Sequence, residues 1–172
     1  VTDVKGCTQT ALTNITEPTP LAANITSNTP VACNGGSTGS ATISASGGTP
    51  GYTYLWAPGG GTNPAASNLA AGTYTVTIKD VNNCVKQLNV VISQPALLIA
   101  IISGNNISCT GSNNGSITAA PTGGTAPYQY VWTTNPVQTT ATATNLSPGT
   151  YTVTITDSRG CTKTNNFTIT QP

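Results

Sequence analysis

Histidine and methionine are absent from this sequence of 172 residues, and charged side chains are scarce, with five Lys or Arg and four Asp or Glu. The only glutamate, Glu17, stands in a proline-bearing stretch. A catalytic site usually needs a His or an acidic group within reach of a nucleophile or water. The Asp residues of the main body recur at turns, where capping of the backbone is their ordinary role. The sequence therefore predicts no catalytic residues and no enzyme.

The same scarcity argues against a bound metal or a highly charged partner. Zinc sites use His or CxxC pairs, and this chain has neither. Calcium needs several oxygen ligands around one ion, whereas Asp80 and Asp157 each stand alone. Nucleic acids and acidic lipids select clustered Lys and Arg, but here the basic residues are scattered and the net charge is +1. We expect no metal, no cofactor and no nucleic-acid partner.

No apolar run reaches the length of a signal peptide or a membrane span, so direct membrane insertion is not expected. Solubility must rest on hydroxyl and amide groups, because threonine is the commonest residue. This composition is typical of an extracellular protein. The chain starts without Met and ends at a repeat boundary, so we expect a fragment of a longer protein whose export signal lies elsewhere.

What the sequence does contain is a repeat with a period of 77 residues. Gly149–Asp157 restates Gly72–Asp80, and Gln171-Pro172 restates Gln94-Pro95. This period is longer than that of solenoid repeats and long enough for a small all-β domain. We therefore predict domains arranged in series along the chain. They are the tail of a preceding repeat (residues 1–18), a first full repeat (19–95) and a second full repeat (96–172).

Alternating apolar and hydroxyl side chains predict antiparallel strands in each repeat, as in Tyr74, Val76 and Ile78 against their threonine neighbours. Glycine and proline punctuate the segments between, and no window holds a helical period. We predict an all-β immunoglobulin-like sandwich of six or seven strands per repeat. The predicted strands are Gly39–Ser46, Tyr52–Ala57, 72–79 and 85–93, their counterparts Gly115–Ala120, Tyr128–Thr133, 149–156 and 162–170, and edge strands near Leu21–Ile25 and Leu97–Ile102.

Aromatic residues favour a sandwich over a barrel. Each repeat has a Trp on a middle strand, and a Leu-x-x-Gly-x-Tyr turn that resembles a tyrosine corner at Tyr74 or Tyr151. Alternating aromatics on the Trp strand share one face, which can be the core or a platform for sugar rings. The core is the expected role, because the chain has one Phe and little other large apolar volume. The candidate ligand contacts of the alternative are Trp56, Trp132, Tyr52 and Tyr128.

The five cysteines follow the same period. Cys7, Cys84 and Cys161 are 77 residues apart, and Cys33 and Cys109 lie near the front of the two full repeats. This arithmetic predicts one disulfide within each repeat, Cys33–Cys84 and Cys109–Cys161, and leaves Cys7 unpaired. Each bond would close a loop of about 50 residues, worth about 4 kcal/mol in the chain-entropy model. Buried free thiols are the alternative.

Three recurring elements resemble the SprB repeat family of very large surface proteins in gliding Bacteroidetes. They are the Gly-x-Tyr-Thr-Val-Thr-Ile-x-Asp strand, the turn into Asn-Cys or Gly-Cys, and the closing Gln-Pro. Both full repeats and the leader share them, and Gly149–Cys161 is the most specific run. The resemblance implies a cell-surface adhesin that is exported by type IX secretion and associated with the outer membrane through the rest of the parent protein.

These observations predict a structural and adhesive repeat segment that acts as a stiff, disulfide-clamped stalk, and the resemblance implies that this stalk serves gliding motility and surface attachment. The expected partners are neighbouring repeats of the same chain, with polysaccharide or a solid surface as a further contact. Proline-bearing junctions such as Gln94-Pro95-Ala96 limit bending because they lack a flexible Gly/Ser tether. The alternative is a carbohydrate-binding module that uses the strand aromatics or the loops Pro58–Ala66 and Asn135–Thr144.

Overall fold

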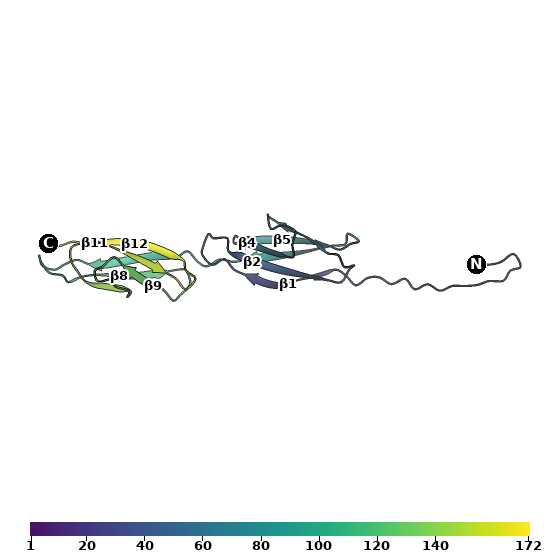
Figure 1. The fold of residues 1–172 in the computed structure, drawn as a ribbon, viewed down its shortest axis with the longest axis horizontal. Helices are drawn as coiled ribbons and strands as arrows, with labels where there is room; N and C mark the ends of the chain where they lie inside the picture. The colour runs from purple at the N-terminus through teal and green to yellow at the C-terminus, as the bar shows by residue number, and fades with distance from the viewer.

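The computed structural model describes residues 1–172 and consists of two β-sandwiches without any helix (Figure 1). We call them the first sandwich (residues 22–92) and the second sandwich (residues 99–169). They lie end to end along the longest axis, and the leader, residues 1–18, extends away from the first sandwich (Figure 1). The predicted all-β, immunoglobulin-like class is confirmed.

Each sandwich contains six strands in the same order. The first sandwich is built from β1 (Ala22–Thr29), β2 (Gly39–Ser46), β3 (Thr53–Ala57), β4 (Ala65–Leu69), β5 (Gly72–Lys79) and β6 (Val85–Ile92). The second is built from β7 (Ile99–Asn105), β8 (Gly115–Thr122), β9 (Gln129–Trp132), β10 (Thr142–Leu146), β11 (Gly149–Thr156) and β12 (Thr162–Ile169).

Two three-stranded antiparallel sheets face each other in each sandwich. Their orders are β1-β2-β4 and β3-β5-β6 in the first, with β7-β8-β10 and β9-β11-β12 as the equivalents. These are the A-B-E and C-F-G orders of a constant-type immunoglobulin domain without strand D. In place of that strand, a loop of residues 58–64 connects β3 to β4 across the two sheets.

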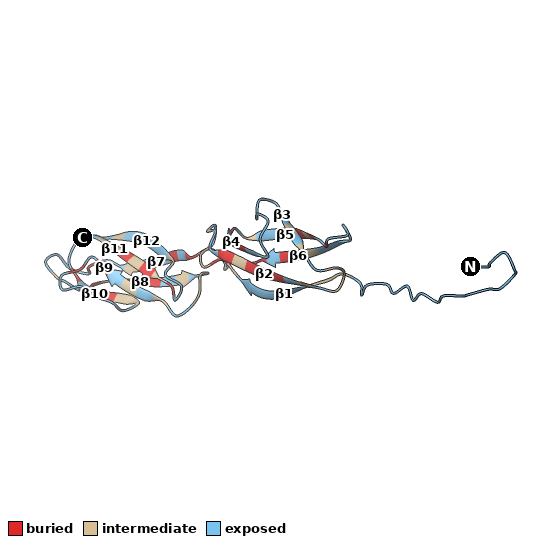
Figure 2. Ribbon diagram, turned by 45° about the vertical axis from the view of Figure 1, so that its right-hand side comes forward, coloured by how far each residue is buried: buried red, intermediate tan, exposed pale blue.

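Side chains of β5 explain how the sequence selects this fold. Tyr74, Val76 and Ile78 are buried, and the threonines between them face outward, as the alternation predicts. The strand pairs with β6 over its whole length, from Gly72 opposite Ile92 to Lys79 opposite Val85. Each sandwich has its own core of such residues, ten or eleven in number, and the leader is exposed throughout (Figure 2).

The strands β4 and β10 were not predicted, because their pattern departs from simple alternation. Their buried residues, Ala66 with Leu69 and Ala143 with Leu146, are three positions apart instead of two or four. The cause is an irregularity in each strand, where the pairing register shifts and Asn68 or Asn145 takes a φ of 56°. Asn tolerates this left-handed conformation better than most residues, and such a bulge turns the following side chain inward.

A hydrogen bond ties the start of β5 to the loop before it. The Tyr74 hydroxyl donates to the Ala70 carbonyl oxygen at 3.1 Å, and the Tyr151 hydroxyl donates to Ser147 at the same distance. A phenol near the start of strand F that bonds the backbone a few residues upstream has the geometry of a tyrosine corner. It fixes the crossover from β4 to β5 in the first sandwich and from β10 to β11 in the second.

Replacement of the Tyr74 hydroxyl tests this tie. Tyr74→Phe is expected to lower the free energy of unfolding by about 1 kcal/mol, because the ring stays packed and one partly buried hydrogen bond is lost. Urea denaturation followed by tryptophan fluorescence measures the change. Tyr54→Phe is the matched control, since Tyr54 packs on the same core but its hydroxyl makes no hydrogen bond within the chain. Equal effects of the two substitutions would contradict the role given to the corner.

Candidate functional site at the repeat junction

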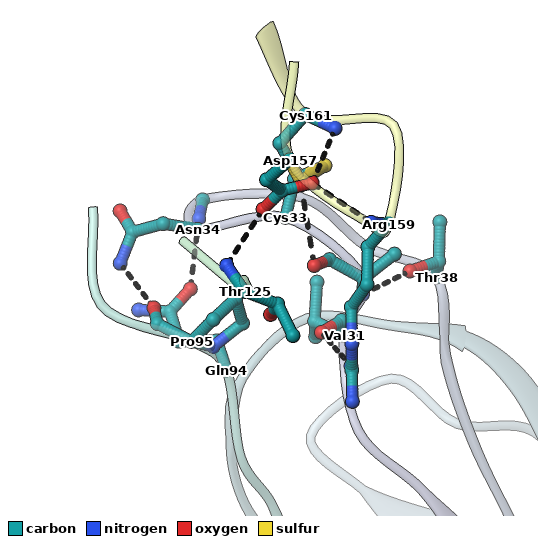
Figure 3. Close-up of a disulfide and its surroundings, with 12 residues drawn as sticks. Val31, Cys33, Asn34, Thr38, Gln94, Pro95, Thr125, Asp157, Arg159 and Cys161 are labelled. Atoms are coloured by element: carbon teal, nitrogen blue, oxygen red, sulfur yellow. Dashed lines mark hydrogen bonds between the residues drawn. A yellow bond between two sulfur atoms is a disulfide. The ribbon is translucent and has the colours of Figure 1, made fainter. Parts of the chain in front are cut away.

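A disulfide joins the two sandwiches across their junction. Cys33 of the first sandwich bonds to Cys161 of the second, with a sequence separation of 128 residues and a Cα–Cα distance of 5.7 Å (Figure 3). Both cysteines are partly buried, whereas Cys7, Cys84 and Cys109 are free and exposed. The chain therefore crosses the junction covalently twice, once through the backbone and once through sulfur.

This bond corrects the predicted pairings Cys33–Cys84 and Cys109–Cys161. Cys33 lies in the loop after β1, at the end of the first sandwich where β6 ends. A hydrogen bond from the Val31 amide to the Ser93 carbonyl, just after β6, places the loop there. Cys84 lies in the β5–β6 hairpin at the opposite end. An eight-residue strand spans about 26 Å at about 3.3 Å per residue, far beyond the reach of a disulfide. A bond within one repeat is therefore impossible in this fold.

The Cys33 loop, residues 30–38, is held by its own hydrogen bonds and by one buried anchor. Val31 is fully buried in the first core. The Ala32 amide donates to the Thr38 hydroxyl at 2.8 Å, and the Gly36 amide donates to the Cys33 carbonyl at 3.0 Å. These contacts fix the position of the Cys33 backbone at the end of the sandwich, so that its side chain faces the neighbouring repeat.

A buried carboxylate shapes the hairpin that carries Cys161. Asp157 is only 4% exposed, and its Oδ1 accepts hydrogen bonds from the amides of Arg159 and Cys161, each at 2.9 Å. Its Oδ2 accepts from the Thr125 amide at 2.9 Å (Figure 3). A short polar side chain that bonds the amides two and four residues ahead stabilises a tight turn. Asp157 thus sets the direction in which Cys161 leaves the hairpin.

Hydrogen bonds keep this carboxylate ionised. Burial alone would raise the pKa of Asp157, but the amides of Cys161, Thr125 and Arg159, together with the Arg159 charge, lower it below its ordinary value. For Asp80, the equivalent in the first sandwich, the Thr49 amide is the main cause, and the pKa is again lowered. Each carboxylate is therefore a structural anion at neutral pH.

The linker between the sandwiches is bound on both sides. On the first sandwich, Asn34 Nδ2 donates to the Pro95 carbonyl at 3.0 Å, and the Gly35 amide donates to Gln94 Oε1 at 2.8 Å. On the second, the Gly124 amide donates to the Ala96 carbonyl at 2.9 Å. The proline in the sequence predicted a stiff linker, but the hydrogen bonds that hold the linker to the two sandwiches were not predicted.

The linker also packs directly against Gly123. This residue has a φ of 70°, and a Cβ there would overlap the carbonyl group of Leu97. Only glycine combines that conformation with so close an approach of two backbones. The linker is therefore seated on the second sandwich and does not hang free between the two domains.

Arg159 adds a second contact across the junction. Its Nη1 lies 3.4 Å from the Val31 carbonyl oxygen, and the Cys161 sulfur lies 3.5 Å from the Ala32 carbonyl oxygen. Beside the bond is an open hollow of about 410 Å³, in which Lys163 is the one charged residue. Its lining consists of Cys33, Asn34, Leu97, Leu98, Gly160, Cys161, Thr162 and Lys163. A single cation without a paired acid or nucleophile offers no catalytic arrangement.

The aromatic residues considered for sugar binding lie inward. Trp56 and Trp132 are 2% and 1% exposed, and each indole N–H donates to a backbone carbonyl at 2.9 Å, of Asn63 and Thr140 respectively. The half-buried Tyr52 and Tyr128 donate their hydroxyls to glycine carbonyls at 2.6 Å. A sugar platform needs an exposed ring face, so the structure places both tryptophans in the cores instead.

Neither a metal cluster nor a membrane helix is found. No three His, Cys, Asp or Glu side chains gather in a way that could hold a metal ion. Asp80 and Asp157 lie in different sandwiches and direct their oxygens at backbone amides. The chain contains no helix with the length and hydropathy required to cross a membrane.

The role of the two buried carboxylates predicts a specific acid response. Their pKa values are lower in the folded than in the unfolded state, so their stabilisation is present above about pH 4 and lost as pH falls through the folded values. Asp80→Asn/Asp157→Asn should be less stable at pH 7 and lose less on further acidification. Thermal unfolding between pH 7 and pH 2 measures this.

The chain offers a matched control for that experiment. Of its four acidic side chains, Asp3 and Glu17 lie in the leader, outside both sandwiches. Asp3→Asn is therefore expected to leave the unfolding temperature and its acid dependence as in the natural chain. An unchanged acid limb in the double variant would show that the buried carboxylates do not cause it.

Comparisons with solved structures return multidomain immunoglobulin proteins. The chain is similar to a structure on Dscam isoform specificity (12% identity, TM-score 0.40, 91% of this chain and 47% of that one). The amphioxus IgVJ-C2 molecule has 13% identity and a TM-score of 0.38, and the match covers 91% of this chain and 99% of that one. Extracellular domains 3–5 of Drosophila OTK have 14% identity and a TM-score of 0.36, with 86% of this chain and 60% of that one covered. The chain spans about half of the Dscam chain. The fold class rests on the strand order above and not on these low scores.

Comparison with protein families gives a more specific result, although no curated protein matches the chain. The SprB repeat model matches residues 25–61 and 103–137, which extend from β1 to the segment after β3 and from β7 to the segment after β9. The matched segments include the Cys33 and Cys109 loops, whereas the run Gly149–Cys161 lies outside them. The SprB repeat model therefore matches one segment in each of the two sandwiches, as the sequence resemblance predicted.

Proposed function

We propose that this chain is a stiff spacer within a large exported adhesin, in which SprB repeats in series hold more distal parts away from the cell surface. An extracellular, adhesin-like repeat segment fits both the repeat family and the immunoglobulin-like fold. The lack of paired catalytic groups and of a metal cluster supports a structural role over an enzymatic one. Service in gliding motility, export by type IX secretion and attachment to the outer membrane through the parent protein follow from the family resemblance.

The observation that carries the proposal is the double covalent crossing of the junction. A single linker lets two domains bend and twist about its backbone torsions, and domain motion is the default in such chains. Here a second connection, Cys33–Cys161, is added to a linker that is itself held by Asn34 and Gly124. Two separate attachments remove most rotation of one sandwich relative to the other.

The end-to-end geometry suits a spacer. Chain entry and exit lie at opposite ends of each sandwich, so each repeat adds its full length to the array (Figure 1). The longest strands have eight residues and span about 26 Å at about 3.3 Å per residue. Neighbouring repeats are therefore the primary partners, and the threonine rows on the outer faces of β5 and β11 are the surface left for weak contacts with polysaccharide or a solid support.

Stiffness at the junction can be measured directly. Cys161→Ser should leave both cores folded and let the sandwiches reorient, because neither core contains a cysteine. In ¹⁵N relaxation, the oxidised chain should tumble as one elongated body and the variant as two loosely coupled bodies. Cys84→Ser is the control and should behave as the natural chain. Identical tumbling of the natural chain and Cys161→Ser would remove the disulfide from the proposal.

Mechanical extension gives a second test. The bond shields the residues between Cys33 and Cys161 from a force applied at the chain ends, since the force passes through sulfur. A separation of 128 residues corresponds to about 450 Å of extended chain at about 3.5 Å per residue. Single-molecule pulling should therefore release about that much additional length from Cys161→Ser compared with the oxidised chain. Equal contour lengths of the two proteins would contradict the claim that the disulfide carries the applied force.

A further inference from the structure

Two of the free cysteines occupy the same positions in the repeat as the bonded pair. Cys84 corresponds to Cys161 at the hairpin, and Cys109 corresponds to Cys33 in the loop after the first strand. Both are exposed and lie at the outer ends of the two-sandwich unit. The bonded pair thus shows how these two positions meet when one repeat follows another.

The end of the second sandwich that carries Cys109 is already arranged like the end that carries Cys33. Ile107 is buried there as Val31 is, and its amide donates to the Thr170 carbonyl as that of Val31 donates to Ser93. The Ser112 amide donates to the Cys109 carbonyl at 3.1 Å, which repeats the bond from Gly36 to Cys33. The loop is therefore built before any partner arrives.

The chain exit at this end is also held in the same way. The Thr110 hydroxyl donates to the Pro172 carbonyl at 3.4 Å, and Thr110 stands at the position of Asn34, which binds the Pro95 carbonyl. Pro172 is thus held where Pro95 is held at the existing junction. A repeat that followed would start from the place at which the second sandwich starts relative to the first.

The opposite end of the chain carries the complementary hairpin. Asp80 Oδ1 accepts from the Cys84 amide at 2.8 Å and Oδ2 from the Thr49 amide at 3.0 Å, as Asp157 does with Cys161 and Thr125. The leader forms the same turn, since Asp3 Oδ1 accepts from the Cys7 amide at 2.9 Å. This supports the leader as the tail of a preceding repeat.

We propose that each end of this chain is half of a junction of the Cys33–Cys161 kind, so that another SprB repeat docks end to end and is joined through Cys109 or Cys84. The occupant is a repeat with an Asp-x-x-x-Cys hairpin on one side and a Cys loop on the other. This inference extends the spacer proposal from one junction to the array. It differs from that proposal in the residues on which it depends.

The bond requires a two-electron oxidant, here a small disulfide such as oxidised glutathione. A thiolate of one cysteine attacks that disulfide, forms a mixed disulfide and releases one small thiol. The second cysteine thiolate attacks the protein sulfur of the mixed disulfide and releases the other. Two cysteine thiols are oxidised and one small disulfide is reduced to two thiols, which take up the two protons that the cysteine thiols lose.

One contact of the existing junction differs at the Cys84 end. Arg159, which reaches the Val31 carbonyl, is replaced there by Asn82, whose amide donates to the Thr49 hydroxyl instead. A hairpin with Arg at this position is therefore the better partner for the Cys109 loop. Copies of residues 96–172 provide such a hairpin.

The chain as it exists tests the inference with Cys7→Ser to remove the leader thiol. In a buffer of oxidised and reduced glutathione, concentrated protein is expected to form covalent oligomers in which peptide mapping finds Cys109 bonded to Cys84. The matched controls Cys109→Ser and Cys84→Ser should lose those oligomers. Symmetric Cys84–Cys84 and Cys109–Cys109 bonds in equal proportion, which random collision gives, would argue against specific docking.

A three-sandwich chain, made by adding a second copy of residues 96–172 after Pro172, provides the stronger partner at high effective concentration. Cys109 should bond to the added hairpin cysteine and become unreactive to maleimide, while Cys33–Cys161 persists. Bonding in this chain alone assigns the junction to successive repeats of one polypeptide. A Cys109 that stays reactive here overturns the inference, whereas the tumbling and pulling results for the existing junction would still support the spacer.

Discussion

When the chain enters a sandwich at one end and leaves it at the other, one flexible linker is normally the only connection to the next domain. The bond between Cys33 and Cys161 removes that freedom, and the other features of the junction depend on it or support it. Asp157 orients the hairpin cysteine, Val31 anchors the opposing loop, and Asn34 fixes the linker alongside. Because the hydrogen bonds hold both partners in place, little ordering remains to be done when the sulfurs join.

The scarcity of charge places unusual weight on a few polar contacts. A domain of this size buries a small core, so single interactions form a large part of its stability. The indole N–H of Trp56, the hydroxyl of Tyr74 and the carboxylate of Asp80 all meet backbone groups, and no buried side-chain polar atom is left without a partner. Most of the specificity of this fold thus comes from side chains that satisfy the backbone at loops, with ion pairs playing almost no part.

The sequence was sufficient for the fold class but not for the site. Alternation identified β5 and β11 because their inward residues fall strictly two apart, and the bulges at Asn68 and Asn145 hid β4 and β10. The cysteine period could not distinguish a bond within a repeat from one between repeats, because the two options differ by one whole period. What decides is the direction of each strand. β1 runs toward the following repeat and β5 runs away from it. Because the two strands belong to different sheets, no local sequence pattern reveals their relative direction.

A recurring junction would change how an array carries load. Under tension, the covalent path through a repeat can leave the backbone at one cysteine and re-enter at another, so only the residues between its two cysteines count toward full extension. In the first sandwich these are the residues from Cys33 to Cys84, about 50 of the 77 in the period. At about 3.5 Å per residue the limit falls from about 270 Å to about 180 Å per repeat. Placing cysteines at opposite ends of each sandwich therefore limits both bending and unravelling, which a bond within each repeat would not achieve at the junctions.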